Sequence, residues 1–195
     1  MGCSCRPRRC WGCTAAAACG YGTGVGGLPA AAATGGLRGF PAALTSFIGR
    51  EEAVREVAGL LEECRLVTVT GPGGVGKTRL VGQVAGLVAG RFTDGAWLAG
   101  LAPVRDPAQV AAVVASALGI REQPGTPLAE ALARVLAGQQ LLLVLDNCEH
   151  VIAAAAELCA GLLTACDDVR VLATSREPLA VAGEACGVPE CGHWT

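Results

Sequence analysis

A run of eight residues, GPGGVGKT at positions 71–78, restricts the possible folds of this chain more than any other feature. The run matches the pattern G-x-x-x-x-G-K-[ST], in which glycines let backbone N–H groups turn inward around phosphate oxygens. The β-branched run RLVTVT precedes it, and an apolar segment with helical spacing follows it. This context predicts a strand, a loop and a helix whose N-terminus adds its partial positive charge at a bound phosphate.

The lysine of this run is the only lysine in the chain, whereas arginine occurs 14 times. A compact ammonium group suits a point contact with phosphate, so we expect Lys77 to reach the β- and γ-phosphates of a nucleotide. The Thr78 hydroxyl would then ligate Mg²⁺. The alternative is a glycine-rich turn in a chain with 28 glycines, which explains neither the lone lysine nor the flanking strand and helix. The residues expected to contact the nucleotide here are Gly71, Gly73, Gly74, Val75, Gly76, Lys77, Thr78 and Arg79.

Strand patterns and helix patterns alternate along the rest of the chain. Apolar runs predict strands at 65–70, 95–101, 141–145 and 169–173, and helical spacing predicts helices that end near residues 63, 89, 118, 137 and 165. The continuous apolar run at 141–145 is typical of a parallel strand buried on both faces. Asp106-Pro107 and Thr126-Pro127 are expected to cap the helices that follow them. The alternation predicts an α/β fold with a parallel sheet. Together with the glycine run at 71–78, it predicts a P-loop NTPase fold with three layers.

Three polar residues lie where the predicted strands end, at the edge of a parallel sheet where ligands bind. Asp146 directly follows an apolar run, and we expect it to hold Mg²⁺ through water, although an ordinary Asp-Asn turn is the alternative. Glu149 could orient an attacking water or cap the next helix. Arg176 could reach a γ-phosphate, or it could form a salt bridge with Glu177. We interpret Lys77, Asp146, Glu149 and Arg176 as the catalytic residues.

The first 40 residues differ in composition from the remainder. They carry four arginines and no acidic residue, contain five of the 11 cysteines, and show neither helical nor strand periodicity. We interpret residues 1–40 as a disordered tail whose deletion changes neither stability nor affinity, and we expect the domain to begin near Pro41. Three alternatives remain open: zinc bound through Cys10 and Cys13, a signal peptide, or myristoylation of Gly2.

The overall charge and hydropathy argue against several classes of protein. The net charge of −2 is unlike that of a strongly basic nucleic-acid binder, so we expect no direct DNA binding by this chain. No uninterrupted apolar run reaches the ~18 residues of a membrane span, which predicts no membrane insertion. Cys148, Cys159 and Cys166 lie in apolar contexts and are interpreted as small core residues. Nothing therefore requires an oxidising compartment, and a cytoplasmic location is expected.

These motifs together resemble the signal-transducing P-loop ATPases of the STAND class, with NB-ARC and AAA-like domains. Four segments carry the similarity: 44–57 (LTSFIGREEAVREV), 65–80 (RLVTVTGPGGVGKTRL), 141–151 (LLLVLDNCEHV) and 169–179 (VRVLATSREPL). Within the class, the chain most resembles the ATPase core of large bacterial transcriptional regulators of the LuxR and SARP types. The resemblance covers about residues 41–190 and implies that Gly49 and Arg50 lie near the adenine of ATP or ADP.

The chain departs from this family in two respects. Asn147 follows Asp146 where many relatives carry a second acid, which implies slow hydrolysis suited to a switch. The family normally continues with a helical lid, a winged helix, sensor repeats and a DNA-binding domain, whereas this chain ends at Thr195. Its last residues, 191–195, resemble nothing in the family. The resemblance therefore implies a truncated regulator, or one unit of a split gene, in which the C-terminal lid and the winged helix are absent.

The resulting hypothesis is an ATP/ADP-binding signal-transduction module that uses Mg²⁺, hydrolyses ATP slowly and works with other domains or subunits of a regulator. Two alternatives remain. One is a P-loop kinase for a small molecule, which would need a substrate pocket and an arginine-rich lid. The other is a non-catalytic fragment with weak nucleotide binding, which a nucleotide-binding assay would separate from the main hypothesis.

Overall fold

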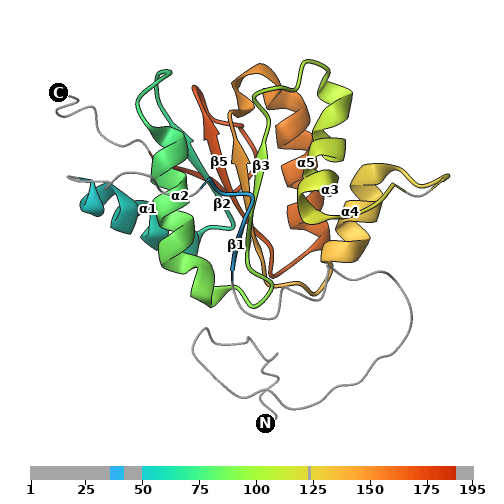
Figure 1. Cartoon of the computed structure of the whole chain (residues 1–195), viewed down its shortest axis with the longest axis horizontal. Coiled ribbons are helices and arrows are strands. Elements are labelled where there is room, and N and C mark those ends of the chain that lie inside the picture. The colour runs from blue at the N-terminus through green and yellow to red at the C-terminus, as the bar shows by residue number, and fades with distance from the viewer. Residues whose placement is uncertain (1–35, 42–49, 123, 188–195) are drawn as a thin grey trace, which may run out of the picture.

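A three-layer α/β sandwich makes up the described part of the protein and confirms the predicted fold class (Figure 1). The computed structural model describes residues 36–41, 50–122 and 124–187. Its strands are β1 (Leu37–Arg38), β2 (Leu66–Thr70), β3 (Ala96–Gly100), β4 (Leu142–Asp146), β5 (Arg170–Ser175) and β6 (Glu184–Gly187). Its α-helices are α1 (Glu51–Glu63), α2 (Lys77–Val88), α3 (Val110–Leu118), α4 (Leu128–Leu136) and α5 (Ile152–Ala165), with short 3-10 helices at Ala89–Arg91, Pro107–Gln109 and Cys148–His150. None of the helices in these ranges is long and apolar enough to span a bilayer.

Every strand pair in the sheet is parallel, and within the described residues the six strands are ordered β1-β3-β4-β5-β2-β6. Helices α1 and α2 cover one face of the sheet, and α3, α4 and α5 cover the other (Figure 1). The carboxyl ends of parallel strands lie along one edge, so the loops after β2, β4 and β5 meet there. The predicted site residues are thereby brought together from three segments that are distant in sequence.

The central strand β4 is buried on both faces, as its apolar sequence predicts. Leu143 and Leu145 pack into the core beneath α3, α4 and α5, whereas Leu142 and Val144 pack into the core beneath α1 and α2. All four side chains are fully buried. This burial on both faces fixes the position of Asp146, the last residue of β4, at the rim of the sheet.

Three cysteines lie in this core, as predicted for Cys148, Cys159 and Cys166. Burial raises the pKa of the Cys159 thiol to about 12. Burial likewise raises the pKa of the Cys148 thiol well above its ordinary value. Both thiols therefore stay protonated at neutral pH and behave as small apolar side chains.

The two edge strands, β1 and β6, are not predicted by the sequence analysis. β1 forms from residues assigned to the tail, and it pairs with Ala96 and Trp97 of β3. The guanidinium carbon of Arg38 lies 5.1 Å from the centre of the Trp97 ring, within cation–π range. The folded part therefore begins before the predicted start at Pro41, because a two-residue strand is too short to show a period in the sequence. The residues that carry the zinc, signal-peptide and myristoylation hypotheses, and residues 1–35 of the tail interpreted as disordered, lie outside the described residues.

Removing residues 1–40 is expected to destabilise the protein relative to removing residues 1–35, which corrects the expectation that residues 1–40 are dispensable. The longer deletion takes away β1, the cation–π contact with Trp97 and the packing of Phe40 against the core beneath α1 and α2. We expect these losses together to lower the free energy of unfolding by about 2 kcal/mol. Thermal melts of the two truncated proteins give the comparison, and equal melting temperatures would show that β1 contributes nothing.

Helix capping follows the prediction at one of the two expected sites. The Asp106 carboxylate accepts a hydrogen bond from Ala108 N–H at 3.0 Å in the 3-10 turn that leads into α3. At α4 the N-cap residue is Pro127, no side chain caps the helix, and Thr126 Oγ1 instead accepts from Arg134 Nη2 at 3.3 Å. The Thr126 prediction is wrong because the helix begins one residue later than expected, which leaves Thr126 outside the cap position.

Thr68 is a buried residue of β2 whose hydroxyl has no hydrogen-bond partner among the described residues. Valine has nearly the same shape and no hydroxyl, so Thr68→Val is expected to raise the free energy of unfolding by about 1 kcal/mol. Denaturant titration measures this change. Thr164→Val is the control, because it removes an exposed hydroxyl that donates to Ala160 O and should not stabilise the protein. A less stable Thr68→Val protein would contradict the assignment of an unpaired hydroxyl.

Candidate functional site

The glycine loop connects the end of β2 to the start of α2, as the sequence predicts. Gly74 and Gly76 have φ angles of 80° and 85°, a left-handed conformation that residues with a Cβ atom rarely adopt. Gly76 is the N-cap of α2, so the first backbone N–H groups of the helix have no intrahelical acceptor and face the loop. Such N–H groups, together with the helix dipole, make an anion-binding site.

Lys77 is the first residue of α2, and its side chain folds back over the loop. Its Nζ donates to Gly71 O at 2.7 Å and to Pro72 O at 2.9 Å. These bonds use two of the three ammonium hydrogens and keep the positive charge at the mouth of the loop. The bond to Pro72 O is exposed, so a phosphate oxygen can exchange with a loop carbonyl as the partner of Lys77.

Thr78 and Asp146 lie side by side although 68 residues separate them in the sequence. Thr78 Oγ1 donates to Asp146 Oδ1 at 2.9 Å and to Oδ2 at 3.0 Å. Strands β2 and β4 are not neighbours, because β5 lies between them. The contact arises because α2, which packs against β4, carries Thr78 across to the end of that strand.

The oxygen atoms of Thr78 and Asp146 suit a small, hard cation. Mg²⁺ prefers oxygen ligands. The Thr78 hydroxyl and the Asp146 carboxylate supply oxygen atoms that are already in contact, and Asp146 could hold the ion directly or, as the sequence predicts, through water. The described residues contain no cluster of three or more His, Cys, Asp or Glu side chains that could hold a metal alone. A cation here would therefore need water and phosphate oxygens as further ligands, as is usual for Mg²⁺.

Thr174 contacts Asp146 from the side of the sheet. Its buried hydroxyl donates to Asp146 Oδ1 at 2.7 Å and accepts from Asn147 N–H at 2.8 Å. The parallel register, in which Leu145 of β4 is opposite Ala173 of β5, puts Thr174 beside Asp146. The sequence pattern alone gives Thr174 no separate role. The available signal was a threonine near the end of a strand that could neighbour the strand carrying the acid.

Glu149 and Arg176, two of the predicted catalytic residues, form an ion pair with each other. Arg176 Nε donates to Glu149 Oε1 at 3.2 Å, so the partner is Glu149 rather than the suggested Glu177. The Glu149 side chain is 11% exposed, whereas that of Arg176 is 66% exposed. A Cβ atom added at Gly73 would lie 3.6 Å from Arg176 Nη2, so the guanidinium lies beside the glycine loop.

Asn147 connects Glu149 to His150. It has a φ angle of 68°, a left-handed conformation that asparagine tolerates better than most residues. With its amide oriented to satisfy both ends, Oδ1 accepts from His150 Nε2 at 2.8 Å and Nδ2 donates to Glu149 Oε1 at 3.2 Å. A polar chain therefore runs from His150 through Asn147 and Glu149 to Arg176. Glu149 does not cap α5, whose N-terminus has no side-chain hydrogen bond.

Arg50 links the start of α1 to the glycine loop. Its Nη1 donates to Val75 O at 2.8 Å and lies so close to Gly76 that a Cβ atom there would be 3.1 Å away. This contact and the left-handed φ together explain why only glycine fits at position 76. Of the other predicted nucleotide contacts, Arg79 is exposed on α2, and Gly49 lies outside the described residues.

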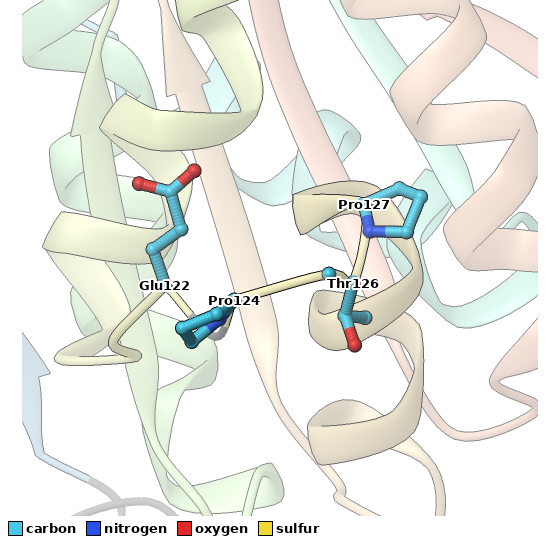
Figure 2. A pocket seen from close by; sticks show the side chains of 5 residues that line it. Glu122, Pro124, Thr126 and Pro127 are labelled. Carbon is cyan, nitrogen blue, oxygen red and sulfur yellow. The ribbon is translucent and has the colours of Figure 1, made fainter.

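A separate surface hollow lies at the connection between α3 and α4 (Figure 2). It is lined by Glu122, Pro124, Gly125, Thr126 and Pro127. The hollow shares no residue with the glycine loop or with the ends of β4 and β5, so it is distinct from the site described above.

The parallel sheet, the glycine loop between β2 and α2 and the acid at the end of β4 define a protein of the P-loop NTPase class. The sequence profile of the family described as novel STAND NTPase 1 matches residues 35–183. The chain belongs to this family, and it is therefore a nucleotide-binding signalling module. The matched range begins before β1, in agreement with the inclusion of that strand in the fold.

Two proteins of Mycobacterium tuberculosis are similar in sequence. An uncharacterized protein is 43% identical over 141 residues, which cover 72% of this chain and 36% of the relative. A protein provisionally named an HTH-type transcriptional regulator is 47% identical over 125 residues, which cover 64% of this chain and 14% of the relative. The chain thus spans a minor part of the length of both relatives.

Two solved structures share the fold at low sequence identity. One is a signal transduction ATPase with numerous domains (STAND) from Pyrococcus horikoshii, which has a tetratricopeptide repeat sensor. Its TM-score is 0.50 at 14% identity, and the aligned part covers 74% of this chain and 23% of the Pyrococcus chain. The other is the structure of Drosophila ORC bound to DNA, with a TM-score of 0.53 at 16% identity. The aligned part covers 73% of this chain and 43% of the Drosophila chain. At these identities the similarity concerns the fold alone.

Proposed function

We propose that this chain binds ATP and ADP at residues 71–79, with Mg²⁺ held by Thr78 and Asp146, and acts as a nucleotide-dependent switch. The observation that carries the proposal is the 2.9 Å contact between Thr78 Oγ1 and Asp146 Oδ1 at the mouth of the glycine loop. It joins a hydroxyl at the start of a helix to a carboxylate at the end of a strand, the two groups that P-loop NTPases use for Mg²⁺. When bound, Mg²⁺ neutralises charge on the phosphate oxygens.

The other residues around the loop have separate roles in this proposal. The free N–H groups of the loop and of the first turn of α2 donate to phosphate oxygens. Lys77 exchanges its bonds to two loop carbonyls for bonds to the β- and γ-phosphates. Arg79 adds positive charge in the first turn of α2. Arg50 holds the loop through Val75 O, and the family resemblance assigns Gly49 and Arg50 to the surroundings of the adenine.

Hydrolysis is slow in this proposal because the groups that would promote it are bound to each other. Glu149 would orient the attacking water, yet its carboxylate accepts hydrogen bonds from Arg176 and, in the orientation described above, from Asn147. Asn147 cannot act as a base. Arg176 contacts Glu149 through Nε, while its Nη2 lies beside the glycine loop, so a γ-phosphate would compete with Glu149 for the same positive charge. ATP and ADP would therefore favour different strengths of this ion pair.

Glu149→Gln is expected to raise the affinity for ATP relative to ADP. The substitution removes the charge that competes with the γ-phosphate for Arg176, and an ion pair whose arginine is 66% exposed contributes about 0.2–1 kcal/mol. The ratio of the two dissociation constants should therefore change by about 1.5- to 5-fold. Glu130→Gln is the control, because it makes the same change in an ion pair with Arg134 on α4 that involves none of the site residues. An unchanged ratio in Glu149→Gln would contradict the competition.

The switch serves a larger regulator in this proposal. The chain covers 14% of a mycobacterial protein that is provisionally named an HTH-type transcriptional regulator. This similarity supports a module of the LuxR or SARP type, with an NB-ARC or AAA-like core, whose partners are other domains or subunits of the regulator. Because its net charge is −2, the chain itself does not bind DNA in this proposal, and those partners do.

The proposal is tested by equilibrium binding of fluorescent mant-ADP and mant-ATP to the purified full chain, with Mg²⁺ or with EDTA. Saturable binding that Mg²⁺ strengthens and unlabelled ADP displaces is the expected result. Absence of binding would identify the non-catalytic fragment instead. Transfer of the γ-phosphate to a small molecule, in a screen with labelled ATP, would identify the kinase.

A further inference from the structure

A buried hydroxyl lies behind Asp146, the Mg²⁺ ligand of the proposed function. Thr174 is only 1% exposed. Its hydroxyl donates to Asp146 Oδ1 at 2.7 Å and accepts from Asn147 N–H at 2.8 Å. We propose that Thr174 is a positioning residue that holds the Asp146 carboxylate in the orientation needed to bind Mg²⁺ together with a nucleotide. This inference rests on the proposed function.

The direction of the Thr174 hydrogen bond is fixed by its second partner. A hydroxyl has one hydrogen to donate and lone pairs to accept with. The Asn147 backbone N–H can only donate, so the Thr174 oxygen must accept from it. The single hydrogen is then available for Asp146 Oδ1, and the backbone at the end of β4 aligns the donor with its acceptor.

Asp146 needs such a partner because a carboxylate turns easily about its terminal bond, for which rotamer preferences are broad. Thr78 contacts the carboxylate from α2, on the side where the nucleotide would bind. Thr174 contacts it from β5, which is packed within the sheet. Two donors on different elements restrict the rotation that one donor would leave free. Groups that hydrogen-bond a metal ligand in this way typically change metal affinity by about 10- to 100-fold when they are removed.

The test measures Mg²⁺ affinity rather than turnover. Mg²⁺ is titrated into the full chain at a fixed concentration of mant-ADP, and the half-saturating Mg²⁺ concentration is compared among variants. Thr174→Val keeps the shape of the side chain and removes the hydroxyl, whereas Thr174→Ser keeps the hydroxyl. Thr68→Val is the matched control, since it makes the same change at a buried threonine of β2 whose hydroxyl has no partner among the described residues.

Thr174→Val should raise the half-saturating Mg²⁺ concentration by about 10-fold or more, while mant-ADP affinity in EDTA stays unchanged. Thr174→Ser and Thr68→Val should both behave like the parent chain. The proposal is overturned if Thr174→Val titrates like Thr68→Val, or if Thr174→Ser is as defective as Thr174→Val. If circular dichroism shows that Thr174→Val does not fold, Thr174→Ala carries the same comparison with Thr174→Ser. A parent chain that fails to bind mant-ADP at all would instead overturn the proposed function.

Discussion

Replacing Lys77 by alanine is expected to remove measurable nucleotide binding while the fold stays intact. The side chain lies over the loop and reaches only the carbonyl oxygens of Gly71 and Pro72, at 2.7 and 2.9 Å, so its removal opens no cavity in the core. A hydrogen bond from an ammonium group to a charged acceptor is worth about 1.5–3 kcal/mol, which is roughly 10- to 150-fold in affinity. Misplacement of Mg²⁺ would add to this loss.

Isothermal titration calorimetry with ADP and ATP measures the loss, and a thermal melt reports on the fold. Arg91→Ala is the matched control, because it removes one positive charge at the far end of the same helical segment, where Arg91 pairs with Glu62. We expect Arg91→Ala to bind nucleotide like the parent chain. Nucleotide binding by Lys77→Ala at the parental affinity would show that the glycine loop is not the phosphate site.

Turnover of ATP by the purified chain is expected to fall well below the ~1–100 s⁻¹ typical of kinases. Rapid phosphoryl transfer needs a positioned water, a metal ion and an arginine at the γ-phosphate. Here Glu149 and Arg176 form an ion pair at 3.2 Å, so the Glu149 carboxylate is engaged and the Arg176 charge is partly neutralised while the pair persists. Arg176 is also 66% exposed, and water weakens its electrostatic effect on a phosphate.

Steady-state phosphate release with Mg²⁺-ATP measures this rate, and Asp146→Asn should abolish whatever turnover remains. That substitution keeps the size of the side chain but removes the charge that Mg²⁺ requires, while Thr78 and Thr174 can still contact it. Release of many phosphates per second, lost in Asp146→Asn or Glu149→Gln, would make the chain a self-sufficient ATPase and contradict the switch. Residual release that Asp146→Asn leaves unchanged would point to a contaminating enzyme.

The contact between Arg176 and Glu149 illustrates how far the candidate site could be predicted. The end of β5 at Ser175 puts Arg176 at the ligand-binding edge of the sheet, and this position follows from the apolar pattern of the preceding residues. The partner of its side chain does not follow from that pattern. Glu177 is next in the sequence, yet Glu149, 27 residues away, is the acid that the fold brings within 3.2 Å.

Features that depend on the order of residues within one segment could be predicted without the fold. The loop at 71–78 can be predicted because its pattern fixes two glycines, one lysine and one hydroxyl residue, whatever lies elsewhere in the chain. The central strands can be predicted because a strand buried on both faces requires an unbroken apolar run, as at 141–145. The alternation of such runs with helical periods is enough to give a parallel sheet with helices on its faces.

Features that depend on pairing between distant segments arise only when the sheet is formed. β1 has only two residues and forms by pairing with β3, so no periodicity in the sequence could predict it. Thr174 contacts Asp146 only because β5 lies next to β4 in a register that aligns Ala173 with Leu145. Strand order and register arise from packing that involves the whole sheet, whereas the sequence pattern of one segment records only its own burial. For this reason the sequence located the acid, and only the fold located the hydroxyl that orients it.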